Sequence, residues 1–144
     1  MADSILWTAL AGVQTAIDTG LNSLANNASV ASSAIDNSSA RHRFALCELV
    51  VTYGTNPTAG SSCGLYVLPS VDGTNYPDFT SGSEPDNALV ALFPLLVNTS
   101  AQRIVIPRIV VPPGLFKLGL KNGAGQTMAA SGNTLKYNLF SEEV

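Results

Sequence analysis

The chain has 144 residues, a length that suits one domain better than two. Seven Lys and Arg residues against ten Asp and Glu residues give a net charge of −3, and charged residues make up only 12 % of the chain, about half the usual share. So acidic a chain is poorly suited to attract nucleic acid or an anionic membrane by charge, and its 46 % of hydrophobic residues excludes a disordered tail.

The first forty residues allow two interpretations. A helix with Asp3 or Ser4 as its N-cap would explain six apolar residues that recur at steps of three and four: Leu6, Leu10, Val13, Ile17, Leu21 and Leu24. Gly12, Gly20 and the abundance of Ser and Thr weaken that interpretation. The alternative, which we favour, is an extended arm followed by one or two edge strands, with residues 30–35 (VASSAI) as the best candidate strand.

After residue 43 the chain shows short β-rich runs separated by turn residues, and no stretch has the 3.6-residue period of a helix. These runs predict six strands: 44–53, 65–68, 88–97, 103–111, 115–121 and 134–140. Two strands before residue 43 bring the total to eight, the number in a jelly roll. The sequence therefore predicts an all-β fold: an antiparallel β-sandwich of jelly-roll type with about eight strands and an N-terminal arm. We expect residues 1–40 to hold the arm and first edge strands, and residues 41–144 to form the sandwich domain.

The two cysteines are expected to be free. Cys47 and Cys63 lie on either side of a turn near Pro57. If their strands pair as a hairpin, Cys47 stands opposite Leu68 and Cys63 opposite Thr52, which separates the sulfurs too far for a disulfide. Both thiols should then act as small apolar side chains.

The sequence also indicates where the chain is made. Its start has an acid and no base before the apolar stretch, the wrong order for a secretory signal. The longest apolar run, residues 88–97, is about half a membrane span and contains Pro94. We expect synthesis in a reducing cytoplasm and no membrane partner.

Motifs for catalysis are weak. His42 stands between Arg41 and Arg43, whose charges oppose proton uptake by a general base. Residues 60–64 (GSSCG) match G-x-S-x-G, but a strand follows them and no histidine comes later, so they are not a nucleophile elbow. Two cysteines and one histidine are too few for a zinc site. We expect no enzyme activity, no catalytic residue, no cofactor and no bound metal.

Five residues are candidates for partner binding. A long polar loop contains Asp72, Asn75, Tyr76 and Asp78, and Tyr76 is an aromatic contact candidate within it. The spacing of Asp72, Asn75 and Asp78 does not match a calcium-binding EF-hand loop. An Asp-Gly turn explains these polar residues without a metal. Trp7 lies in an N-terminal stretch where it could anchor an arm in a neighbour's groove. For both Trp7 and Tyr76, packing in the core is an equal alternative.

Charge is distributed unevenly along the chain. No Lys or Arg precedes Arg41 or occurs between Gly54 and Ala101, whereas the loop after Val71 is acidic. Such asymmetry would allow one copy's acidic loop to meet a neighbour's basic strand. Solvated surface charges are the simpler interpretation.

Three stretches carry a resemblance to a known family: 65–79, 87–122 and 130–136. Their markers are S-x-D-G-x-N-Y-P (Ser70 to Pro77), the P-P-G turn (Pro112 to Gly114) and S-G-N-T-L (Ser131 to Leu135). Over residues 44–137 the chain resembles small virion structural proteins of tailed bacteriophages. The resemblance implies a β-sandwich of jelly-roll type and a place in the virion, most often as a capsid decoration or cement protein, in other cases in tails or head fibres.

We therefore expect a non-enzymatic phage structural protein that bridges and stabilises capsid subunits on the capsid surface of the virion. Its expected partners are the major capsid protein and further copies of itself, with a trimer favoured and no nucleic acid. The alternative is a tail or head-fibre module that binds a glycan or receptor through Tyr76, Asn75 and Asp72. If the arm is the anchor, deleting residues 1–20 should leave a folded sandwich that no longer binds the particle.

Overall fold

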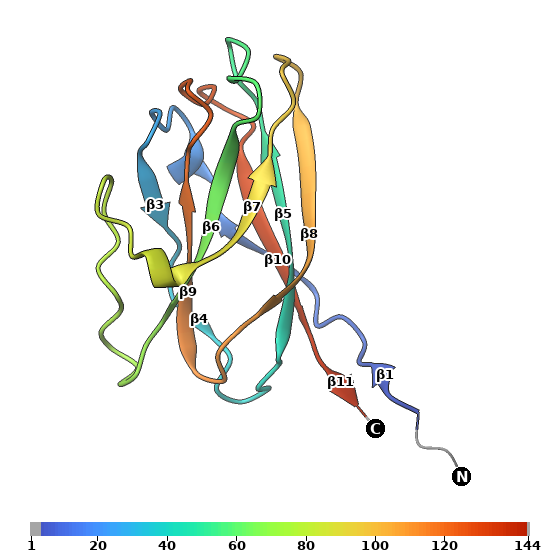
Figure 1. Ribbon diagram of the computed structural model, residues 1–144. Helices are drawn as coiled ribbons and strands as arrows, with labels where there is room; N and C mark the ends of the chain where they lie inside the picture. Colours follow the sequence, from blue (N-terminus) through green and yellow to red (C-terminus); the bar gives the residue numbers. More distant parts are fainter. Residues whose placement is uncertain (1–3, 144) are drawn as a thin grey trace.

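The computed structural model describes residues 4–143, which form strands and two short 3₁₀ helices (Thr19–Leu21 and Asp86–Ala88) but, over that range, no α-helix. Figure 1 shows the strands packed as two layers with a ribbon at one end. In chain order the strands are β1 (Leu6–Trp7), β2 (Val13–Ile17), β3 (Ser29–Ala31), β4 (Ile35–Asp36), β5 (Phe44–Val51), β6 (Ser62–Pro69), β7 (Leu89–Pro94), β8 (Gln102–Val110), β9 (Leu115–Lys121), β10 (Thr134–Phe140) and β11 (Glu142–Glu143).

The two layers are antiparallel sheets. The first sheet has the order β2-β10-β5-β8, and the second has the order β3-β9-β6-β7 with β4 also paired to β9. The all-β prediction is confirmed, and each of the six strands predicted after residue 43 is present. The strand order agrees with a jelly roll, which stays a prediction.

The N-terminal third is extended. The helical alternative is wrong, because β1, β2 and a single 3₁₀ turn occupy the region that it covered. Strands β2, β3 and β4 are edge strands that pair with β10 and β9, so within the described part of the N-terminal third only residues 4–12 extend beyond the sandwich. The predicted strand at 30–35 is two strands, because the buried Ser32 interrupts it and its hydroxyl accepts the N–H of Leu118 at 3.0 Å.

The core lies between the sheets. Alternate residues of β5 face inward and are buried: Ala45, Cys47, Leu49 and Val51. They meet inward residues of the second sheet, among them Leu65, Phe93, Phe116 and Leu118. Fully burying one such large side chain stabilises the fold by about 1.5–3 kcal/mol.

Both cysteines are free and buried, as expected. The hairpin assumed for them is wrong, because β5 pairs with β10 and β8 whereas β6 pairs with β7 and β9. The chain crosses from one sheet to the other after β5, so neighbouring strands in the sequence are not neighbours in a sheet.

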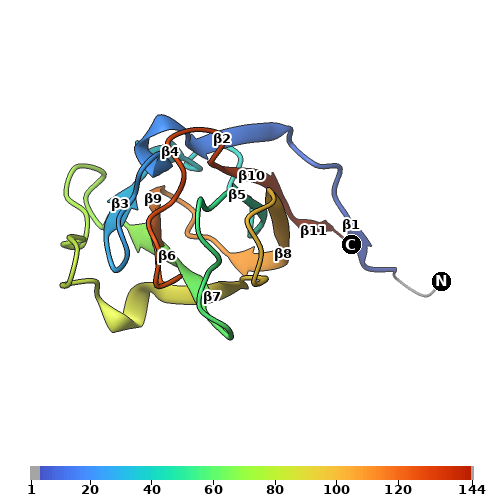
Figure 2. The ribbon, with the colours of Figure 1, turned by 90° about the horizontal axis from the view of Figure 1, so that it is seen from above.

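The chain's own loop, residues 70–88, lies over part of the outer face of the second sheet, around Tyr66 (Figure 2). The Phe79 ring packs on Tyr66, with ring centroids 5.0 Å apart. It also lies over Gly119, where an added Cβ would be 2.6 Å from the ring. Glycine at 119 is therefore what lets the loop lie flat on the sheet.

Replacing Gly119 by alanine should displace Phe79 and lower the free energy of unfolding by about 1–3 kcal/mol. Gly114→Ala is the matched control, because nothing lies within 4 Å of its added Cβ. Urea unfolding gives the stability, and protease cleavage within 70–88 reports the loop. Equal stability of the two variants would contradict this role of Gly119.

The side chain of Glu84 links the same loop to β3 and β9 through a hydrogen bond and an ion pair. It accepts a hydrogen bond from the Ser29 hydroxyl, and Lys121 Nζ lies 2.9 Å from its Oε2. Burial alone would raise the pKa of Glu84, but the hydrogen bonds from Ser29 and Lys121 outweigh it and lower the pKa to about 2 from an ordinary 4.5.

Because the folded-state pKa is depressed, the stability contributed by Glu84 is complete above the ordinary value of 4.5 and is lost as the pH falls toward about 2. The stability advantage of the wild type over Glu84→Gln should thus shrink as the pH falls through this range. Urea unfolding at several pH values measures it, with Asp86→Asn on the same loop as control. An advantage that does not change with pH would contradict the role of this carboxylate.

Candidate interaction surfaces

Strands β1 and β11 form a ribbon that extends beyond the end of the sandwich in both views (Figures 1 and 2). Leu6 pairs with Glu143 and Trp7 pairs with Glu142. The Thr8 N–H donates to the Ser141 carbonyl at 2.9 Å, and the Ser141 N–H donates to the Thr8 hydroxyl at 2.7 Å. We call residues 4–8 together with residues 141–143 the ribbon.

An aromatic cluster joins the ribbon to the first sheet. Trp7 packs edge-on against Phe44 and Phe140, with ring centroids 6.3 and 5.5 Å away. Both phenylalanines are buried, but Trp7 remains 59 % exposed. One side of the indole is therefore fixed by the chain itself, and the other is open to a partner.

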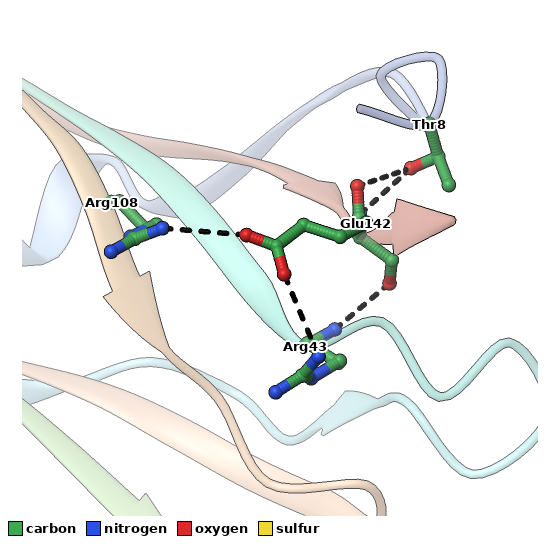
Figure 3. Close-up of polar contacts among 5 residues, drawn as sticks. Thr8, Arg43, Arg108 and Glu142 are labelled. Carbon is green, nitrogen blue, oxygen red and sulfur yellow. Dashed lines mark hydrogen bonds and ion pairs between the residues drawn. The ribbon is translucent and has the colours of Figure 1, made fainter. Parts of the chain in front are cut away.

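Glu142 holds two arginines beside this cluster (Figure 3). Its carboxylate oxygens lie 3.7 Å from Arg43 Nη1 and 3.6 Å from Arg108 Nη1. The guanidinium groups also lie over the Phe44 ring, 5.3 and 4.9 Å from its centroid. The arginines are more than half exposed, so each pair adds about 1 kcal/mol at most, and their main effect is to orient the ribbon.

Replacing Glu142 by glutamine should loosen the ribbon while changing the free energy of unfolding by no more than about 1 kcal/mol. Trp7 is the single tryptophan, so its fluorescence reports the ribbon directly. We expect a red-shifted emission for this variant, and none for the control Glu143→Gln. An unshifted emission would contradict the positioning role of Glu142.

An apolar groove runs along the outer face of the first sheet, starting at the ribbon. It consists of two adjoining hollows of about 460 and 370 Å³ that share Leu46. Its apolar lining is Trp7, Leu10, Val13, Leu46, Val105 and Pro107, and we call this the sheet-face groove. Arg103 and Lys136 line its far part, where Arg103 lies 2.8 Å from Glu48.

A second apolar surface follows the edge strand β7 and the loop after it. No charged residue occurs between Asp86 and Arg103. Five large side chains there are 42–65 % exposed: Leu89, Val90, Leu92, Leu96 and Val97. An uncharged edge strand can pair with a strand of another molecule, and we call this surface the β7 patch.

The loop residues predicted for binding lie apart from Trp7, on the other sheet. Asp72, Asn75 and Tyr76 line one shallow hollow of about 260 Å³, and Asp78 does not. Hydrogen bonds from the Asn75 and Thr74 N–H groups and from the Asn75 amide hold the pKa of the Asp72 carboxyl well below its usual range. The ammonium of Lys117 lies 4.4 Å from the centre of the Tyr76 ring.

Side chains suited to chemistry are dispersed. Within residues 4–143, no three His, Cys, Asp or Glu side chains are placed to hold a metal ion. Burial raises the pKa of the Cys47 thiol to about 12 and also raises the pKa of Cys63, so neither is a ready thiolate. Over the same described part of the chain, no helix is long and apolar enough to cross a membrane.

Sequence reasoning missed the sheet-face groove and the ion pairs of Glu142. A signal for the groove was present in β8 (QRIVIPRIV), where apolar residues occupy both faces of the strand. The ion pair of Arg43 with Glu142 depends on the pairing of β5 with β10, which lie far apart in the chain, and no local pattern encodes it.

No family model, no curated protein and no solved structure matches this chain.

Proposed function

We propose that this protein is a non-enzymatic structural protein of a bacteriophage virion, which decorates the capsid and bridges neighbouring capsid subunits. The support from the structure is the presence of two separate apolar surfaces on a small, weakly charged sandwich. The resemblance of its sequence motifs to those of small phage virion proteins supports the choice of a bacteriophage virion as the particle.

Bridging needs two contact surfaces on one molecule, and the sheet-face groove with its ribbon lies on a different sheet from the β7 patch. Soluble monomers rarely expose large contiguous apolar patches without a partner. The β7 patch contains no charged residue, which lowers the cost of desolvating it against a protein neighbour.

Such a bridge stabilises a shell by mass action, because its contacts exist in the assembled lattice and not between free subunits. Several copies joined to each other would add avidity on a repeating surface. The expected partner is the major capsid protein, and the expected place is the outer surface of the capsid.

Binding to shells that lack this protein tests the proposal. Purified protein is incubated with such shells, the shells are pelleted, and the melting temperature of the decorated shells is compared with that of bare shells. Saturable binding with a raised melting temperature is expected, and Leu92→Ser in the β7 patch should weaken binding at least about tenfold. Absence of saturable binding would contradict the proposal.

A tail or head-fibre module that binds a glycan or receptor is the second candidate. The observation in its favour is the hollow that brings Asp72, Asn75 and Tyr76 together beside Val71. Tyr76→Ala separates the two: loss of adsorption to host cells with intact particles favours the second candidate, and loss of particle stability favours decoration.

A further inference from the structure

We propose that copies of this chain associate with one another, the ribbon of one copy lying in the sheet-face groove of the next. This inference goes beyond the expected self-association because it names the two segments that meet, and it assigns the two apolar surfaces different roles. It is tested without any particle, so its outcome is independent of whether the protein binds a capsid.

The ribbon is the element that most needs a partner. Each of its two strands has only two residues, and an isolated two-stranded ribbon is marginal in water. Its apolar side chains nevertheless face solvent, since Ile5 is 70 % and Leu6 is 60 % exposed. A partner that covers these side chains would stabilise the ribbon and gain the free energy of burying them.

The sheet-face groove has the matching chemistry. Val13 is 66 % and Val105 is 51 % exposed within it, so its floor is apolar and uncovered. On the corresponding face of the second sheet, residues 70–88 already cover the part around Tyr66, on which Phe79 packs, and only the β7 side of that face stays exposed. The outer face of the first sheet therefore offers an open apolar surface to a segment from another molecule.

The ribbon of the same molecule does not fill this groove. Strand β11 follows β10 after a single residue and points away from the sandwich with β1 beside it (Figure 1). Trp7 lies at the near end of the groove, and the chain before it leads outward. Ile5 and Leu6 can thus reach a groove on a second copy placed beside this end.

Charge favours the same arrangement. Glu142 is already paired with Arg43 and Arg108, and Arg103 of the groove is already paired with Glu48. The charges left to attract each other are Glu143 on the ribbon and Lys136 in the far part of the groove. A ribbon that enters a neighbour's groove brings Glu143 toward Lys136. The β7 patch has no charge to offer, so the acidic ribbon favours the groove over that patch.

The test is the mass of the full-length protein in solution, measured by sedimentation over a range of concentrations. The ribbon variant is Ile5→Ser with Leu6→Ser, and the groove variant is Val13→Glu, whose side chain is exposed in the free chain. Each variant alone should dissociate at least about tenfold more readily than the wild type. Val71→Ser, a fully exposed apolar residue on the other side of the molecule, should associate as the wild type does.

Mixing the two variants gives the decisive result. Each keeps one intact half of the contact, so the mixture should form complexes that neither variant forms alone. A wild type that stays monomeric, a mixture that forms no complex, or association lost through Leu92→Ser in the β7 patch would each overturn the proposal. Thermal unfolding is measured for every variant. A melting temperature equal to that of the wild type shows that the change acts on association and not on folding.

Discussion

Replacing Asn122 by alanine is expected to lower the free energy of unfolding by about 3 kcal/mol or more, because it leaves several buried polar groups without partners. Asn122 is fully buried at the end of β9. Its amide donates to the carbonyls of Leu24 and Gln126, at 2.9 and 2.8 Å. Its Oδ1 accepts from the Tyr53 hydroxyl and the Ala124 N–H, both at 3.1 Å.

One side chain thereby joins three loops at one end of the sandwich. The Tyr53 ring is also buried, and burial raises the pKa of its hydroxyl, so that hydroxyl stays neutral and needs a partner. Asn122→Asp keeps the acceptors and loses the amide donors, and it should also destabilise. Asn56→Ala, at an exposed loop position, is the control.

Urea unfolding at neutral pH measures these effects. A loss below about 1 kcal/mol for Asn122→Ala would mean that water replaces the four hydrogen bonds without cost, and would contradict this account.

Deleting residues 1–11 is expected to leave a folded sandwich that associates with itself and with shells at least about a hundredfold more weakly. The deletion removes the ribbon's first strand and Trp7, but keeps Gly12 and the whole of β2. Loss of copy-to-copy contacts would remove avidity on a repeating lattice.

The deletion of residues 1–20 that the sequence suggested is a different experiment. It also removes β2, which pairs with β10 and buries Ile17 to 5 % exposure. We expect that longer deletion to destabilise the sandwich itself. Comparing urea unfolding and shell pelleting for the two deletions separates the roles, and unchanged binding by the 1–11 deletion would refute the role of the ribbon.

The strands after residue 43 could be predicted because β-branched runs and turn residues alternate there. The first forty residues misled the helical interpretation for a physical reason: their apolar spacing arises from separate elements. Ile17 and Leu21 are buried in the core, whereas Leu6, Leu10 and Val13 are exposed on the arm and the outer face. A single helix could not have carried all of these residues on one buried face.

The candidate site was predictable only in part. Trp7 was identified from its position in an uncharged stretch, and the structure places it at the groove with one face exposed. Asp72 and Asn75 were selected as polar loop residues, and the structure shows them bonded to each other, an internal role that composition does not reveal. The apolar residues on both faces of β8 were the one local signal for the groove, but its shape arises where strands far apart in the chain meet.

The number of copies of this protein per purified virion tests the central claim most directly. Quantitative mass spectrometry against the major capsid protein gives that number. A decoration protein on the capsid lattice should be present in numbers on the order of hundreds, because its binding site repeats with the shell's symmetry. A count of a few to about a few tens would place it in the tail, neck or fibres and would contradict a role in bridging capsid subunits.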